Sequence, residues 1–83
     1  MMDITIREFL GKHKELTAEQ VRKLPVGTKV LRHNFDRYGD HVELELTVTQ
    51  SGKKKILTTR DYYGHMIEKS ITKETDRVCY SEV

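Results

Sequence analysis

One short pattern, Asp-x-Tyr-Gly-x-x-(Val or Ile)-Glu, occurs twice in this chain, first at residues 36–43 and again 25 positions later at residues 61–68. Asp is favoured at the first position of a type I turn, and Gly accepts the positive φ angle that closes a β-hairpin through a bulge. The alignment extends into the segment after each turn, where Leu46 matches Ile71. We therefore expect the same turn, followed by the same kind of strand, at two places in one small domain.

The segment after the first copy alternates strictly between polar and apolar side chains. Over residues 41–49, the apolar side chains fall on every second position and so share one face of an extended strand. Four further segments with strand character are separated by turn-forming residues: 29–35, 54–60, 65–71 and 77–82. Five strands joined by short turns predict an antiparallel meander.

The N-terminal part of the chain has a helical pattern instead. Thr5 and Glu8 have the spacing of a capping box, in which two side chains satisfy N–H groups at the start of a helix. Thr17 and Gln20 have the same spacing. Pro25 biases the residue before it away from helical angles, so the second helix should end there. One or two short helices are therefore expected before the first strand.

These elements predict one mainly β (α+β) domain over residues 1–83, with a helical segment at 1–25 and a β-meander at 27–83 that contains the repeated turn. A meander of this length can curl into a small SH3-like barrel. The Leu-Pro-Val-Gly-Thr-Lys-Val segment at 24–30 resembles the start of the first strand in such barrels, which is a likeness of fold only. An open sheet with the helices packed on one face is the alternative.

Composition limits the functions that are open to the chain. With 83 residues, 36% of them hydrophobic, only a thin core can be buried. Fifteen basic residues against 13 acidic ones leave a formal charge of +2, which is no strong field for a polyanion. The single cysteine cannot form an intrachain disulfide, and no apolar run approaches the length of a membrane helix. We therefore expect a cytoplasmic protein without a membrane partner.

Alternate turns of a meander emerge at the same end of the sheet, so the two copies of the repeated turn should lie side by side. The set that they would bring together, here called the aromatic rim, is Arg37, Tyr38, His41, Arg60, Tyr62, Tyr63 and His65. Tyrosine offers flat stacking area, while Arg and His donate hydrogen bonds, so the rim is a candidate binding surface. Its other interpretation is structural, with the tyrosines covering the open end of the core.

The opposite end of the expected sheet is basic. Lys53, Lys54 and Lys55 follow a Ser-Gly turn, and the expected topology places Lys29 and Arg77 near them. Such a cluster can contact the phosphates of a nucleic acid. It can equally be a solvated hairpin tip, whose charges discourage aggregation between sheets.

Other residues give weaker signals. Six of them carry ligand atoms for zinc or another divalent ion: His33, Asp36, Asp40, His41, Asp61 and His65. Their spacing matches no metal motif. Cys79 is expected to be a small buried apolar residue and not a nucleophile. Glu43 and Glu68 occupy equivalent positions with a whole strand between them, which disfavours an acid/base pair. We predict no catalytic residue, no metal and no cofactor.

The sequence therefore favours a non-enzymatic binding module that contacts another protein, because a mixed surface of Tyr, Arg and Asp suits a protein interface. The size and charge also fit an accessory or inhibitor protein of a phage or mobile element, although no motif supports that origin. The alternative is an RNA- or DNA-binding barrel that uses the lysines for phosphates and the tyrosines for stacking. A small enzyme would need a pocket, which a chain this short can hardly enclose. The sequence determines neither the partner nor the oligomeric state.

Overall fold

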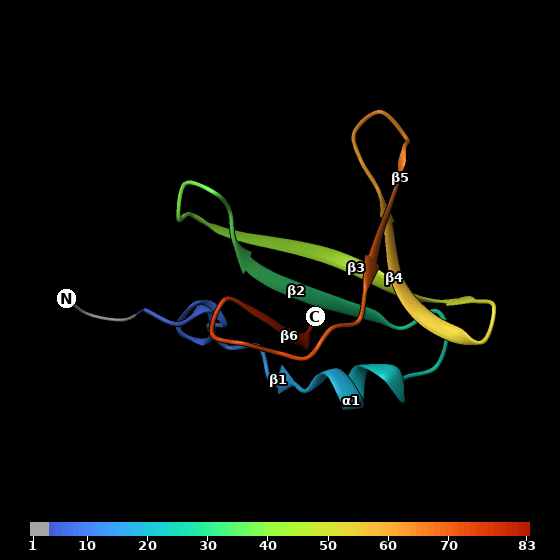
Figure 1. Cartoon of the computed structure of the whole chain (residues 1–83), viewed down its shortest axis with the longest axis horizontal. Helices are drawn as coiled ribbons and strands as arrows, with labels where there is room; N and C mark the ends of the chain where they lie inside the picture. Colours follow the sequence, from blue (N-terminus) through green and yellow to red (C-terminus); the bar gives the residue numbers. More distant parts are fainter. Residues whose placement is uncertain (1–3) are drawn as a thin grey trace.

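The protein, represented by a computed structural model that describes residues 4–83, is an antiparallel sheet with two short helical segments (Figure 1). The first three residues of the expected helical segment lie outside the described residues. The helical segments are η1 (Ile6–Phe9), a 3-10 helix, and α1 (Ala18–Arg22). The strands are β1 (Glu15–Leu16), β2 (Lys29–Phe35), β3 (His41–Ser51), β4 (Lys54–Arg60), β5 (Met66–Ser70) and β6 (Val78–Glu82). The prediction of a mainly β fold is confirmed.

The strands lie side by side in the order β1-β6-β2-β3-β4-β5, and every neighbouring pair is antiparallel. Strands β2 to β5 follow one another as in the predicted meander. Strand β6 does not continue it, because the segment 71–77 leads the chain back to β2, where Tyr80 lies opposite Arg32. The short β1, which has too few residues for an alternating pattern, pairs with the other edge of β6. The sheet is open, so the five-stranded SH3-like barrel is not confirmed.

Apolar side chains are buried on both faces of the sheet. The face that meets α1 holds the larger core, made of Leu16, Ala18, Val21, Val30, Leu46, Val48, Leu57, Ile71 and Tyr80. On the opposite face, Ile6 and Leu10, from η1 and the residue after it, pack with Cys79 of β6. The two helical segments therefore cover opposite faces of the sheet, whereas the open-sheet alternative placed both on one face. The matched apolar positions of the repeat, Leu46 and Ile71, lie in the same core.

The capping box predicted at Thr17 is confirmed. The Thr17 hydroxyl accepts from the Gln20 N–H at 3.1 Å, and the Gln20 side chain accepts from the Thr17 N–H at 2.8 Å. The box predicted at Thr5 is wrong, because the Thr5 side chain makes no cap hydrogen bond. The Glu8 N–H that a cap would satisfy donates to the Thr5 carbonyl at 3.2 Å, which is the bond that a 3-10 turn makes.

Side chains hold the segment 71–77 in place on its way from β5 to β6. The Tyr80 hydroxyl donates to the Thr72 carbonyl at 3.1 Å and accepts from the Thr72 N–H at 3.0 Å. The Glu74 carboxylate accepts from the Ala18 N–H, at the start of α1, at 2.9 Å. The connection that brings β6 back to β2 is thus bonded both to β6 itself and to α1.

The Glu74 contact should make stability depend on pH. The hydrogen bond from the Ala18 N–H is the main cause that holds the pKa of this carboxyl below its ordinary value. A carboxyl whose pKa is lowered by folding adds stability above its unfolded pKa, about 4.3 for Glu, and loses that contribution as the pH falls through the folded value. We expect Glu74→Gln to be less stable than wild type at pH 7 and to lose less stability on acidification. Urea unfolding midpoints across the pH range measure this.

The matched control is Glu68→Gln, which removes an exposed carboxylate of β5, whereas the carboxylate that bonds the Ala18 N–H is that of Glu74. A Glu74→Gln protein whose unfolding midpoint follows the wild-type pH curve would contradict the prediction.

Candidate functional site

The first copy of the repeated turn, at residues 36–40, is closed by the Asp36 side chain. Its Oδ1 atom accepts from the Tyr38 N–H at 2.8 Å and from the Asp40 N–H at 3.0 Å. The Gly39 N–H donates to the Asp36 carbonyl at 3.0 Å, and Gly39 has a φ angle of 82°. These are the bonds of a type I turn followed by a bulge, and any other residue would be strained at that φ angle.

The second copy, at residues 61–65, makes the same set of bonds. Asp61 Oδ1 accepts from the Tyr63 N–H at 2.9 Å and from the His65 N–H at 2.8 Å. The Gly64 N–H donates to the Asp61 carbonyl at 3.0 Å. In each turn the Asp and the Gly supply the geometry, while the tyrosine contributes only its backbone N–H.

The tyrosine side chains of both turns are exposed to solvent. Tyr38 and Tyr63, which occupy equivalent positions, are 78% and 79% exposed, and Tyr62 is 95% exposed. The interpretation that these rings cover the open end of the core is therefore wrong. Because neither the turn nor the core uses them, they remain available for contact with a ligand.

The two turns do not form one rim. Strand β3 pairs with β2 from His41 to Thr47 and with β4 from Thr47 to its end, so Thr47 alone pairs on both sides. Beyond Thr58, the partner of Thr47, strand β4 is paired only with β5, and this hairpin bends away from the sheet (Figure 1). The turns at 36–40 and 61–65 project in different directions. The prediction of a single aromatic rim assumed that each strand pairs along its whole length with both neighbours.

Four residues of the expected rim lie together on the projecting hairpin. We call its distal part, residues 59–67, the hairpin arm, and its rim residues are Arg60, Tyr62, Tyr63 and His65. The Tyr62 and Tyr63 rings meet edge to face with centroids 5.3 Å apart, and the His65 ring lies 6.3 Å from Tyr63. Met66 is 52% exposed beside them. The arm is a two-stranded hairpin, which has little stability of its own. Its aromatic side chains lie where no hydrophobic core requires them.

The other three rim residues are at the first turn, where His41 has a different environment. The Arg37 guanidinium lies 5.4 Å from the centre of the Tyr38 ring. His41 packs between Phe9 of η1, at a centroid distance of 4.9 Å, and His33 of β2, at 5.4 Å. Burial lowers the pKa of His33, which favours the neutral ring. His41 is therefore part of a packed group and not of an exposed rim.

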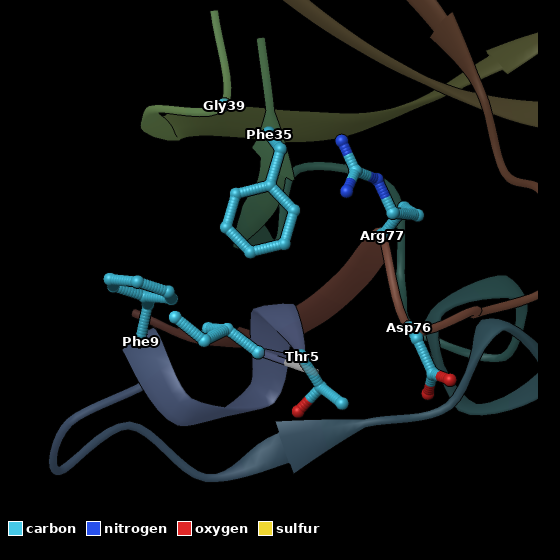
Figure 2. A pocket seen from close by; sticks show the side chains of 7 residues that line it. Thr5, Phe9, Phe35, Gly39, Asp76 and Arg77 are labelled. Carbon is cyan, nitrogen blue, oxygen red and sulfur yellow. The ribbon is translucent and has the colours of Figure 1, made fainter. Parts of the chain in front are cut away.

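A groove with a volume of about 480 Å³ lies beside the first turn (Figure 2). Phe9 and Phe35 meet edge to face there with centroids 5.6 Å apart, and the Arg77 guanidinium lies 4.7 Å from the centre of the Phe35 ring. Arg77 was expected near the lysine run, and it is here because β6 pairs with β2 and not with β5. Neither His41 nor His65 lines this groove.

The lysine run begins in the β3–β4 turn with Lys53 and continues into the start of β4, away from both tyrosine turns (Figure 1). The Lys55 ammonium group donates to the Leu24 carbonyl, so it fastens the end of the helical segment to β4. Lys53, Lys54 and Arg22 line a cavity of about 480 Å³. Lys55 lines the same cavity, so all three lysines border it and Lys55 also makes a structural contact.

The expectation that Cys79 is a small buried residue is confirmed. Its side chain is fully buried and packs with Ile6 and Leu10. Burial raises the pKa of the thiol to about 11, so it stays protonated at neutral pH.

The six predicted ligand-bearing residues do not gather as a set. Asp36 and Asp61 use one carboxylate oxygen each to close their turns. His33 and His41 do come together, and Glu43 joins them. The spacing of the residues along the sequence does not by itself pair Glu43 with a histidine. The register of the β2–β3 hairpin, which puts His33 opposite Glu43, was the missing information.

Comparison of the chain with protein-family models, with curated proteins and with solved structures gives no match. Over residues 4–83, no helix is long and apolar enough to span a membrane. The fold and the exposed residues therefore define the class by themselves: an open antiparallel β protein with a projecting aromatic hairpin.

The two turns should respond differently to the same substitution. In Gly39→Ala and Gly64→Ala the added methyl group meets no neighbour, so the cost comes from the positive φ angle, about 1–2 kcal/mol. In Gly64→Ala, the arm can open locally, because its strands have no third partner. We expect faster amide hydrogen exchange at residues 59–67 with a nearly unchanged urea midpoint, whereas Gly39→Ala should lower the midpoint. Equal loss of global stability in the two variants would disprove local opening.

Proposed function

We propose that this chain is a non-enzymatic binding module that contacts another protein through the hairpin arm. The observation that carries the proposal is the exposure of Tyr62 and Tyr63, which are 95% and 79% exposed although the turn needs neither ring. Tyrosine side chains are enriched at the centres of protein interfaces, since they bury a large area and still donate a hydrogen bond.

The arm also suits a polypeptide partner in its backbone and charges. Strand β5 pairs with β4 alone among the described residues, so its outer edge offers N–H and C=O groups to which an extended segment can add as a further strand. Arg60 and Asp61 place both signs of charge next to the tyrosines. A mixed aromatic surface of this kind favours a protein over a polyanion.

Site-specific photo-crosslinking tests the proposal, and the repeated turn supplies a matched control. A benzophenone amino acid replaces Tyr63 in one variant and Tyr38 in the other, because these side chains have equivalent turns and nearly equal exposure, 79% and 78%. We expect the probe at position 63 to form a covalent adduct with a discrete protein from the native lysate, and the probe at position 38 to form none. Adducts at both positions, or at neither, would count against the arm.

The purified partner then gives the energetic test. We expect Tyr62→Ala and Tyr63→Ala each to cost about 2 kcal/mol of binding free energy, which is roughly a 30-fold loss of affinity. Tyr38→Ala should bind like wild type. Circular dichroism and urea unfolding of each variant separate loss of contact from loss of fold.

Nucleic-acid binding is the second candidate, and the cavity bordered by Lys53, Lys54 and Arg22 is the observation in its favour. The tyrosines lie elsewhere, so phosphate contacts alone would carry the affinity. Titration with short single- and double-stranded oligonucleotides at low and moderate salt tests it. The double substitution Lys53→Ala with Lys54→Ala should weaken binding and reduce the salt slope by about 1 per lysine. Absence of binding at the lower salt concentration would exclude this function.

A further inference from the structure

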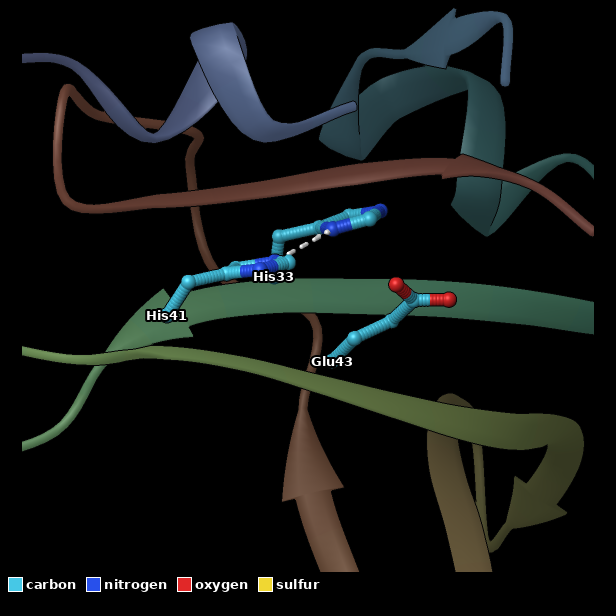
Figure 3. A group of neighbouring side chains, drawn as sticks. All are labelled: His33, His41 and Glu43. Atoms are coloured by element: carbon cyan, nitrogen blue, oxygen red, sulfur yellow. Dashed lines mark hydrogen bonds between the residues drawn. The ribbon is translucent and has the colours of Figure 1, made fainter. Parts of the chain in front are cut away.

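The sheet face that meets η1 carries a group of metal-ligand atoms from His33, His41 and Glu43 (Figure 3). His33 on β2 lies directly opposite Glu43 on β3, and His41 precedes Glu43 by two positions on the same strand. Residues two apart in a strand point to the same face, as do directly opposite residues of a pair. One ligand atom of each residue lies within 4.8 Å of the others. The register of a single hairpin therefore brings the three together.

Ser81 of β6 bonds the buried ring of His33 through the Nε2 atom. When the Ser81 hydroxyl donates to the Glu82 carbonyl, at 3.2 Å, its oxygen accepts from the Nε2–H of His33, at 2.8 Å. The Nδ1 atom of the neutral ring then carries a lone pair, and it lies 3.2 Å from Nε2 of His41. A buried partner on the far nitrogen of a histidine, which fixes its tautomer and orientation, accompanies most metal-ligating histidines.

We propose that Nδ1 of His33, Nε2 of His41 and a carboxylate oxygen of Glu43 bind a divalent transition-metal ion, and that zinc fits this set best. Two imidazole nitrogens and one carboxylate oxygen form a three-ligand set that zinc accepts while a fourth position stays open to water. Two nitrogens at zinc–nitrogen distances of about 2.05 Å are about 3.3 Å apart in a tetrahedral site. The separation of 3.2 Å between the two ring nitrogens matches it. Calcium and magnesium prefer oxygen ligands, so two imidazoles select against them.

Metal binding exchanges one hydrogen bond for the metal bonds. Without the ion, Nε2 of His41 and Nδ1 of His33 share a hydrogen bond of 3.2 Å, and the two ring planes are 6° apart. Binding through Nε2 of His41 requires the proton of that ring to be on Nδ1, so that the Nε2 lone pair can face the metal. Glu43 is exposed and His41 half-buried, whereas His33 is fully buried. The ion therefore enters from the side of Glu43.

The ion would connect parts of the fold that are distant in the sequence. Its ligands come from β2 and β3, and Ser81 extends the group to β6. Phe9 packs on the His41 ring with a centroid distance of 4.9 Å and an interplanar angle of 22°, so η1 is restrained as well. We expect zinc at 100 times its dissociation constant to raise the thermal unfolding midpoint by roughly 10 °C or more.

Zinc titration of the full chain by calorimetry tests the site, with the absorption spectrum of the cobalt(II) form as a readout of four-coordinate geometry. We expect one ion per chain. Ser81→Ala should lower zinc affinity about 10- to 100-fold, and His41→Ala and Glu43→Gln should each lower it by at least about as much. The matched control is His65→Ala, because His65 also lies beside a carboxylate, 3.6 Å from Asp61, but belongs to no three-ligand group within residues 4–83. It should keep the wild-type affinity.

The variants at positions 41 and 43 avoid the buried His33, and their urea unfolding in the presence of a chelator verifies that they fold. Failure of the wild-type chain to bind zinc would overturn the proposal. So would equal affinity of wild type and His41→Ala, or a loss in His65→Ala as large as that in His41→Ala, since both results place the ion elsewhere.

Discussion

The pairing of β6 with β2 is the contact on which the rest of this structure depends. Successive residues of a strand point to opposite faces, so β6 contributes to two cores at once. Tyr80 completes the core under α1, while Cys79 completes the smaller one under η1. A chain of 83 residues is too short to build a thick second layer. Strand β6, which is buried on both faces, supplies core residues to both sides of the sheet instead. The hydrogen bonds between Tyr80 and Thr72 then hold the segment 71–77, which leads from β5 to β6.

This arrangement separates a supported part of the sheet from an unsupported one. Strands β6 and β2 lie between the two helical segments, and the buried His33, which bonds His41, is there. The hairpin arm has two strands and no covering layer, and the most exposed tyrosine, Tyr62, is at its tip. Local stability follows buried contacts, so the arm is the part that can adapt to a partner at small cost to the fold.

Much of the local structure could be predicted from the sequence, but the candidate sites could not. The alternation after residue 41 and the Asp and Gly of each turn predicted strands and turns whose hydrogen bonds the structure shows. The expected rim, however, combined residues of two turns that project apart, because β3 changes its pairing partner at Thr47. Grouping His33 with Glu43 also required the strand register, since ten positions separate them in the sequence.

By itself, the sequence determined the five longer extended segments, the two repeated turns and the cap of the second helix. These are local properties, because each involves only a few neighbouring residues. They are the alternation of side chains along a strand, the positive φ angle open to Gly39 and Gly64, and the reach of the Thr17 hydroxyl. Only the tertiary structure decided that β6 lies beside β2, and with it which side chains share a surface. Every strand edge offers the same backbone donors and acceptors, so the choice of partner depends on the apolar area that the whole chain buries.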